Sequence, residues 1–155
     1  MATIKTTTIE QSDKLVELGI DSNTADLSYV MEPVVVDGKV HYLDEYQLSV
    51  MNYPSAKEIF DKYLSQHKPF AGVKPAWSLT ALLDIIPGKV FDKEIGSGGL
   101  IMYKTMNNDR YRFAYHGIYT SNFHENQIEA AIEVLEWLFT NGYLKKDKNT
   151  NEDRD

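Results

Sequence analysis

The sequence predicts an α+β protein, with an antiparallel sheet built from two hairpins that packs against three or four helices. Three observations lead to this class. Two pairs of strand-like segments, 34–43 and 100–116, are each joined by a polar turn. A short, very apolar segment lies between Pro75 and Pro87, and a long amphipathic segment covers 127–141.

The first helix is expected over 10–18, with Thr8 as its N-cap. Gly19 is placed to end this helix, because glycine adopts the left-handed conformation of a C-terminal cap at little cost. The segment 25–31 is expected to form a short helical turn.

The segment 34–43 carries the best local hairpin signal in the chain. Asp37-Gly38 lies between β-branched runs, as in a type I′ turn, which needs a positive φ at both central residues. Pro33 marks the start of the hairpin, because proline has no backbone donor for a strand ladder.

A second helix is expected over 55–66, where Ser55 and Glu58 have the spacing of a capping box. The proline-flanked segment 68–75 is interpreted as a linker, because each proline biases the residue before it away from the helical region.

The apolar segment between the two prolines is predicted to be a helix at the centre of the core. Ser78 caps it and Pro87 stops it. Apolar side chains repeat at helical spacing, so each is expected to be mostly buried: Leu79, Leu82, Leu83 and Ile86.

The second hairpin is expected from strands 100–106 and 110–116. Its register depends on the length of the loop, which the sequence leaves open. A three-residue loop over 107–109 would place one set of side chains on a single face: Ile101, Tyr103, Tyr111, Phe113 and Tyr115.

The last helix is expected over about 127–141, with Gly142 after its end. The segment 147–155 is polar and contains no hydrophobic residue, so it is predicted to be a disordered tail. The remaining 1–146 are predicted to form a single domain.

The motif Pro75-Ala76-Trp77-Ser78-Leu79, continued by Leu82-Leu83 and Ile86-Pro87, resembles a "PAWSLxxLLxxLP"-type helix. This helix occurs in a group of small, uncharacterised proteins of bacterial genomes and their phages or prophages. The resemblance covers roughly 74–144, and Ile85-Ile86 stands where the group tends to have leucines. It implies a mobile-element context and names no activity or catalytic residue.

The chain has 155 residues, a net charge of −7 and no cysteine. Disulfides and cysteine–zinc sites are therefore excluded. The acidic balance makes direct nucleic-acid binding an unfavourable hypothesis. No segment has the length of a membrane span, and the first residues lack the apolar core of a secretory signal. We expect a soluble, cytoplasmic protein without a cofactor.

No cluster of residues has the spacing of a catalytic or metal site. The glycines of 96–99 lead into a strand-like run, whereas a phosphate-binding loop leads into a helix. None of the four histidines is three or four residues from another, so no metal site is predicted: His41, His67, His116 and His124.

Three hypotheses of function remain. The first is a non-enzymatic protein-interaction module of a phage or mobile element, which binds another protein or itself. Its expected contact residues concentrate aromatic and basic character near the second hairpin: Tyr103, Arg110, Arg112, Tyr115 and His116.

The second hypothesis is a small enzyme with a pocket near His116 and His124. The third is an acidic regulator that binds a nucleic-acid-handling protein through a stripe of glutamates on the last helix. That stripe comprises Glu125, Glu129, Glu133 and Glu136.

Overall fold

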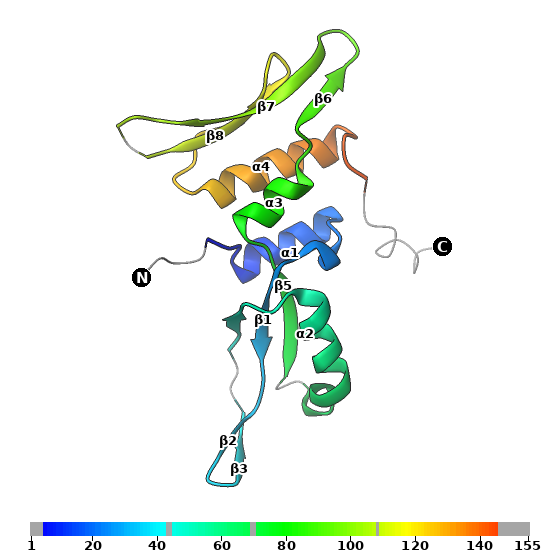
Figure 1. Cartoon of the computed structure of the whole chain (residues 1–155), viewed down its shortest axis with the longest axis vertical. Helices are drawn as coiled ribbons and strands as arrows, with labels where there is room; N and C mark the ends of the chain where they lie inside the picture. Colours follow the sequence, from blue (N-terminus) through cyan, green and yellow to red (C-terminus); the bar gives the residue numbers. More distant parts are fainter. Residues whose placement is uncertain (1–4, 43–44, 69–70, 108, 146–155) are drawn as a thin grey trace.

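A computed structural model describes residues 5–42, 45–68, 71–107 and 109–145. Strands lie at both ends of the molecule, and the helices α1, α3 and α4 lie between the two ends (Figure 1). The helices are α1 (Ile9–Leu18), α2 (Tyr53–Ile59), α3 (Leu79–Ile85) and α4 (Gln127–Thr140). One-turn 3-10 helices occupy Ser22–Thr24 and Ser65–His67, and a π-helical turn over Phe60–Leu64 extends α2.

Antiparallel strands form three separate sheets in the described residues. The first has the order β4-β1-β5, the second is the hairpin β2-β3, and the third has the order β6-β7-β8-β9. The first two comprise β1 (Leu27–Met31), β2 (Val34–Val36), β3 (Lys39–His41), β4 (Gln47–Ser49) and β5 (Gly72–Ala76). The third comprises β6 (Lys89–Asp92), β7 (Gly96–Lys104), β8 (Tyr111–Tyr115) and β9 (Tyr119–Thr120).

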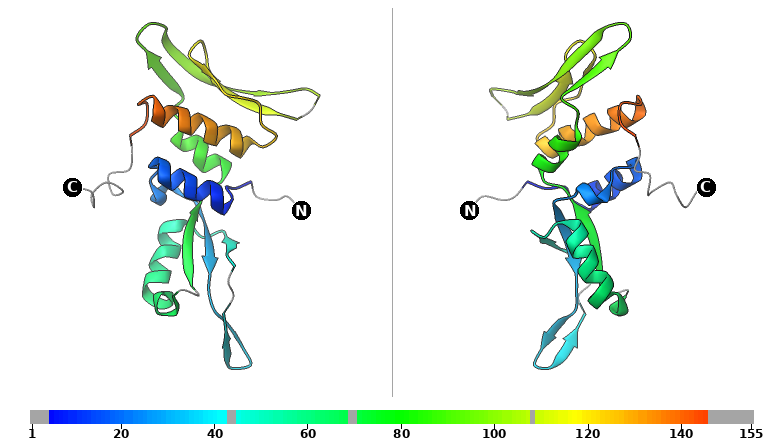
Figure 2. Two further views of the ribbon diagram at one scale, coloured as in Figure 1. Left: turned by 180° about the vertical axis from the view of Figure 1, so that it is seen from behind. Right: turned by 45° about the vertical axis from the view of Figure 1, so that its right-hand side comes forward.

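The α+β class with antiparallel strands is confirmed, but the two hairpins do not share one sheet. The first hairpin, β2-β3, stands alone, and β7-β8 lies at the other end of the molecule (Figure 2). The expectation of one sheet fails because β1 and β5, which were not predicted as strands, pair with each other and form a separate sheet with β4.

The helical turn predicted for 25–31 is wrong, because 27–31 form β1, and the linker predicted for 68–75 is wrong over 72–75, which belong to β5. β1 pairs with β5 over five residues, and Ser28 in β1 is fully buried and donates a hydrogen bond to the carbonyl of Met51. Long-range pairing of this kind overrides a weak local preference. Pro75 is tolerated in β5 because this strand is at the edge of its sheet and pairs only with β1.

The caps of α1 follow the prediction, whereas α2 begins two residues early. Thr8 and Gln11 form a capping box, and Gly19 ends α1 with a φ of 107°. α2 starts at Tyr53 because Asn52 takes the N-cap role, accepting a hydrogen bond from the Ser55 amide at 2.9 Å. The predicted capping box of Ser55 is therefore wrong.

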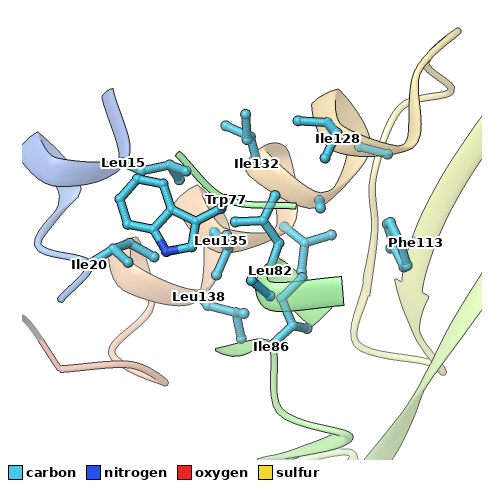
Figure 3. Close-up of a cluster of buried hydrophobic side chains, with 14 of the residues drawn as sticks. Leu15, Ile20, Trp77, Leu82, Ile86, Phe113, Ile128, Ile132, Leu135 and Leu138 are labelled. Atoms are coloured by element: carbon cyan, nitrogen blue, oxygen red, sulfur yellow. The ribbon is translucent and has the colours of Figure 1, made fainter. Parts of the chain in front are cut away.

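α3 lies at the centre of the main core, packed between α4 and the N-terminal segments (Figure 3). Ser78 caps it as predicted, through a hydrogen bond from the amide of Ala81. Leu82 and Ile86 are buried, whereas Leu79 and Leu83 are only half-buried. Fully buried side chains of α4 complete this core: Ile128, Ala130, Ala131, Val134, Leu135 and Leu138.

Trp77 occupies the junction between β5 and α3 and is fully buried. Its indole nitrogen donates to the Thr24 hydroxyl at 2.9 Å, and its amide donates to the Thr7 hydroxyl at 3.1 Å. The amide of Thr7 in turn donates to the Trp77 carbonyl. These bonds fasten the N-terminal segment and the turn after α1 to the entrance of α3.

The register of β7 and β8 differs from the one that a three-residue loop would give. Tyr103 pairs with Arg112, and Lys104 pairs with Tyr111. A shift of one residue exchanges the two faces of a strand relative to its partner. Phe113 and Tyr115 therefore share a face with Leu100 and pack into the core, away from Tyr103.

None of the helices in the described part of the chain combines the length and apolar content that crossing a bilayer requires. The tail predicted for 147–155 lies outside the described residues.

The central place of α3 can be tested by comparing two neighbouring leucines. We expect Leu82→Ala to lower the free energy of unfolding by about 2–5 kcal/mol, because Leu82 is fully buried and its loss leaves a cavity. Leu83→Ala, at a half-buried position, should cost clearly less. Urea denaturation of both variants measures the difference in the free energy of unfolding, and equal losses would contradict the deeper burial of Leu82.

Candidate interaction surfaces

The five residues predicted to contact a partner do not form one surface. Tyr103 and Arg112 are cross-strand neighbours, and the backbone hydrogen bond from Thr105 to Arg110 extends the same ladder. Their side chains belong to the face of β7-β8 turned away from α4. Tyr115 lies on the opposite face, is fully buried and donates a hydrogen bond to the Pro87 carbonyl, so its predicted role in binding is wrong.

His116 is exposed but lies at the far end of β8, where its amide bonds to Gly99. It is six residues from Arg110, which corresponds to roughly 20 Å along an extended strand. The structure therefore separates His116 from the other basic residues of the predicted surface.

Phe123 joins Tyr103 and Arg112 on the outer face of the sheet, and sequence reasoning missed it. The guanidinium of Arg112 lies over the Phe123 ring, 3.8 Å from the ring centre. The buried Nε of Arg112 has no hydrogen-bond partner among the described residues. We call the side chains Ile101, Tyr103, Arg110, Arg112 and Phe123 the aromatic–basic face.

A β-bulge brings Phe123 to this position. Ser121 bonds to Phe113 and His124 bonds to Tyr111, so two residues of one strand, Asn122 and Phe123, oppose Arg112 alone. The extra residue interrupts the alternation that would otherwise have marked this segment as a strand. No pattern within the sequence signals the bulge.

His116 and His124 do not share a pocket. His124 pairs with Tyr111 at one end of β8 and His116 follows the other end, so about 16 Å of strand separates them. The two histidines therefore cannot line one pocket, and the enzyme hypothesis has no site at this place. Within the described ranges, no group of three or more His, Asp or Glu residues is placed to hold a metal ion.

Glu133 of α4 collects the polar groups of the bulge. Its carboxylate accepts hydrogen bonds from the Tyr119 hydroxyl at 2.9 Å and from the Asn122 amide at 2.8 Å. The Asn122 side chain lies at 3.2 Å and His124 Nε2 at 2.9 Å from the other carboxylate oxygen. The bulge leaves the Asn122 amide out of the strand ladder, and Glu133 satisfies it.

The hydrogen bonds decide the titration of this cluster. Burial raises the pKa of Glu133, but hydrogen bonds from His124, Asn122 and Tyr119 outweigh burial, so its pKa lies below the ordinary value of 4.5. Burial and the hydrogen bond to Glu133 raise the pKa of the Tyr119 phenol. The arrangement keeps Glu133 charged and Tyr119 neutral, which suits a structural clamp between β9 and α4.

The glutamates of the last helix do not form a free acidic stripe. Glu133 is engaged by the bulge, Glu136 pairs with Lys14 of α1, and Glu129 lies 3.7 Å from His124 Nδ1. Only Glu125 of the four has no ion-pair partner among the described residues. An acidic regulator acting through this stripe is therefore poorly supported.

A second surface lies at the opposite end of the molecule. The hairpin β2-β3, which we call the arm, projects beyond β1 away from the main core (Figures 1 and 2). Asp37 and Gly38 both have positive φ, as the predicted type I′ turn requires. Every residue of both strands is exposed, including Val34, Val35, Val36 and Val40.

A groove with a cavity volume of about 320 Å³ adjoins the base of the arm. Apolar side chains from β1, β4, β5 and α2 line it, and among the described residues the charged ones that line it are Glu32 and Glu45. Its apolar lining comprises Val30, Val34, Leu48, Met51, Ala56, Ile59, Phe60, Leu64 and Val73. Seventeen large hydrophobic side chains are exposed in the described residues, and ten lie within 34–63. Seven of these ten belong to the arm or line the groove, which together form an extended apolar surface.

Comparison of the chain with family models, with curated proteins and with solved structures finds no match.

The Glu133 cluster gives a pH-dependent prediction. Glu133→Gln should lower the free energy of unfolding at pH 7 by about 1–3 kcal/mol, because it removes a charged acceptor of several hydrogen bonds. The pKa of Glu133 is lower in the folded than in the unfolded state, so this stability is present above pH 4.5 and is lost as the pH falls.

Denaturation at a series of pH values measures the effect, with Glu125→Gln as a control that changes the charge equally at an exposed position. The difference in the free energy of unfolding between wild type and Glu133→Gln should become smaller toward acid pH. A difference that is independent of pH would contradict the role of the carboxylate charge.

Proposed function

We propose that this protein is a non-enzymatic protein-interaction module, and that its aromatic–basic face binds an acidic surface of a partner protein. The observation that carries the proposal is the stacked pair of Arg112 and Phe123, with Tyr103 as the cross-strand neighbour. Arginine and tyrosine concentrate binding energy at interfaces, because they desolvate a large area and keep directional hydrogen bonds.

The stacking supports this role in two ways. Contact with Phe123 fixes the plane of the guanidinium, so less conformational entropy is lost when a carboxylate binds. No ion pair in the described part of the chain involves Arg110 or Arg112. Both side chains are thus available to an acidic partner, which the local positive charge would also steer.

The surroundings of the face favour binding over catalysis. Its residues lie on the outer face of the sheet and not in a pocket. The polar cluster around Glu133 is already engaged in internal hydrogen bonds. The resemblance of the 74–144 segment to small phage and prophage proteins makes a mobile genetic element the setting in which we would look for the partner.

Affinity capture tests the proposal. Tagged wild-type protein, Arg110→Ala/Arg112→Ala and Lys93→Ala are used to capture proteins from a lysate of the source organism. We expect a partner that wild type and Lys93→Ala retain and the double variant loses. With that partner purified, Arg112→Ala should weaken binding about 5–30-fold, or about 1–2 kcal/mol.

Lys93→Ala is a matched control, because it removes an exposed positive charge in the turn between β6 and β7. Thermal melting shows whether each variant keeps its fold. An identical set of captured proteins for wild type and the double variant would refute the proposed surface.

A further inference from the structure

The arm is an unusual element because no third strand adjoins its two strands in the described residues. It is a two-stranded sheet, and both strands are exposed along their whole length. Val35 pairs directly with Val40 on one face, and Val35 is 67% exposed. A lone two-stranded hairpin is only marginally stable in water, and contiguous exposed apolar side chains mark interaction sites.

The groove beside the arm has complementary chemistry. Its floor is apolar, and the described charged residues that line it, Glu32 and Glu45, are both acidic. The arm carries the basic side chains Lys39 and His41, which share one face with Val34 and Val36 and lie on the face opposite the Val35–Val40 pair. No described residue forms an ion pair with Lys39.

We propose that the arm and the groove form a reciprocal dimer interface, in which the arm of one copy lies in the groove of a second copy. The Val35–Val40 face of the arm thus meets the apolar floor of the groove, and the long side chain of Lys39, which extends from the other face of the narrow arm, pairs with the acidic rim. The same contact is made twice, because each copy presents both halves.

The positions of the arm and the groove indicate that the occupant of the groove is a second copy of this chain. Arm and groove lie at the same end of the molecule, and Val34 belongs to both. A two-fold axis at this end lets both arm–groove contacts form at once, which is the self-complementary arrangement of the commonest oligomers. A foreign strand or helix in the groove would leave the valines of the arm exposed.

The dimer does not rest on the proposed function. It uses residues within 30–64 and Val73, at the opposite end from the aromatic–basic face. Loss of the dimer and loss of acidic-partner binding can therefore be measured separately on the same protein.

Sedimentation velocity across a wide concentration range is the first test. We expect wild type to form a dimer, and Val35→Asp in the arm and Met51→Asp in the groove each to weaken it more than about tenfold. Both positions are exposed, so circular dichroism should show an unchanged fold. Met106→Asp is the matched control, because Met106 is 99% exposed but lies beyond β7.

Site-specific cross-linking is the second test. Because the chain has no cysteine, each introduced cysteine is the only thiol in its chain. A Val35→Cys chain is mixed with an Ile59→Cys chain and treated with a short bifunctional maleimide. We expect a covalent heterodimer, and none when Val35→Cys is mixed with Met106→Cys.

Three results would overturn the inference. The first is a wild-type protein that stays monomeric at all concentrations. The second is a dimer that Val35→Asp and Met51→Asp leave intact. The third is a monomer whose groove binds a different protein with the arm left free.

Discussion

The contacts of Trp77 are the constraint on which the arrangement of this molecule depends. The residue directly follows β5 and precedes the N-cap of α3, so it lies where the sheet at one end meets the helical layer. Its indole fills the core beside Leu15 and Leu82, while its polar atoms bond to Thr7 and Thr24 (Figure 3). Burying so large a side chain stabilises the core, and satisfying its nitrogen avoids the cost of a buried, unpaired donor.

The helical layer fixed by this junction separates two surfaces of different character. The aromatic–basic face carries arginine at one end, and the arm and groove carry valine and acidic side chains at the other (Figure 1). Because α1, α3 and α4 lie between them, a partner on one surface would not cover the other. The two ends can therefore serve different contacts at the same time.

Local signals predicted those parts of the fold that local chemistry determines. Thr8, Gly19, Ser78 and the Asp37-Gly38 turn act through residues within a few positions of themselves, and each has its predicted role. β1 and β5 depend on pairing across more than forty residues, which no window of sequence contains.

The contact residues could not be predicted fully for the same reason. The face of the sheet on which Tyr115 lies depends on the strand register, which the sequence leaves open. Phe123 lies beside Arg112 only because one extra bulge residue shifts it there.

The bonds between Thr7 and Trp77 also govern the order in which the chain can fold. They close a loop of 70 residues, and β1 must likewise wait for β5. Contacts of such long sequence separation slow folding, since the entropy of loop closure is lost before the contacts form. On the ribosome, the N-terminal half emerges with β1 lacking its longer partner until Trp77 has been made. During that interval the edge of β1 that β5 later covers is unpaired beside the exposed valines of the arm, which makes this stage of synthesis prone to aggregation.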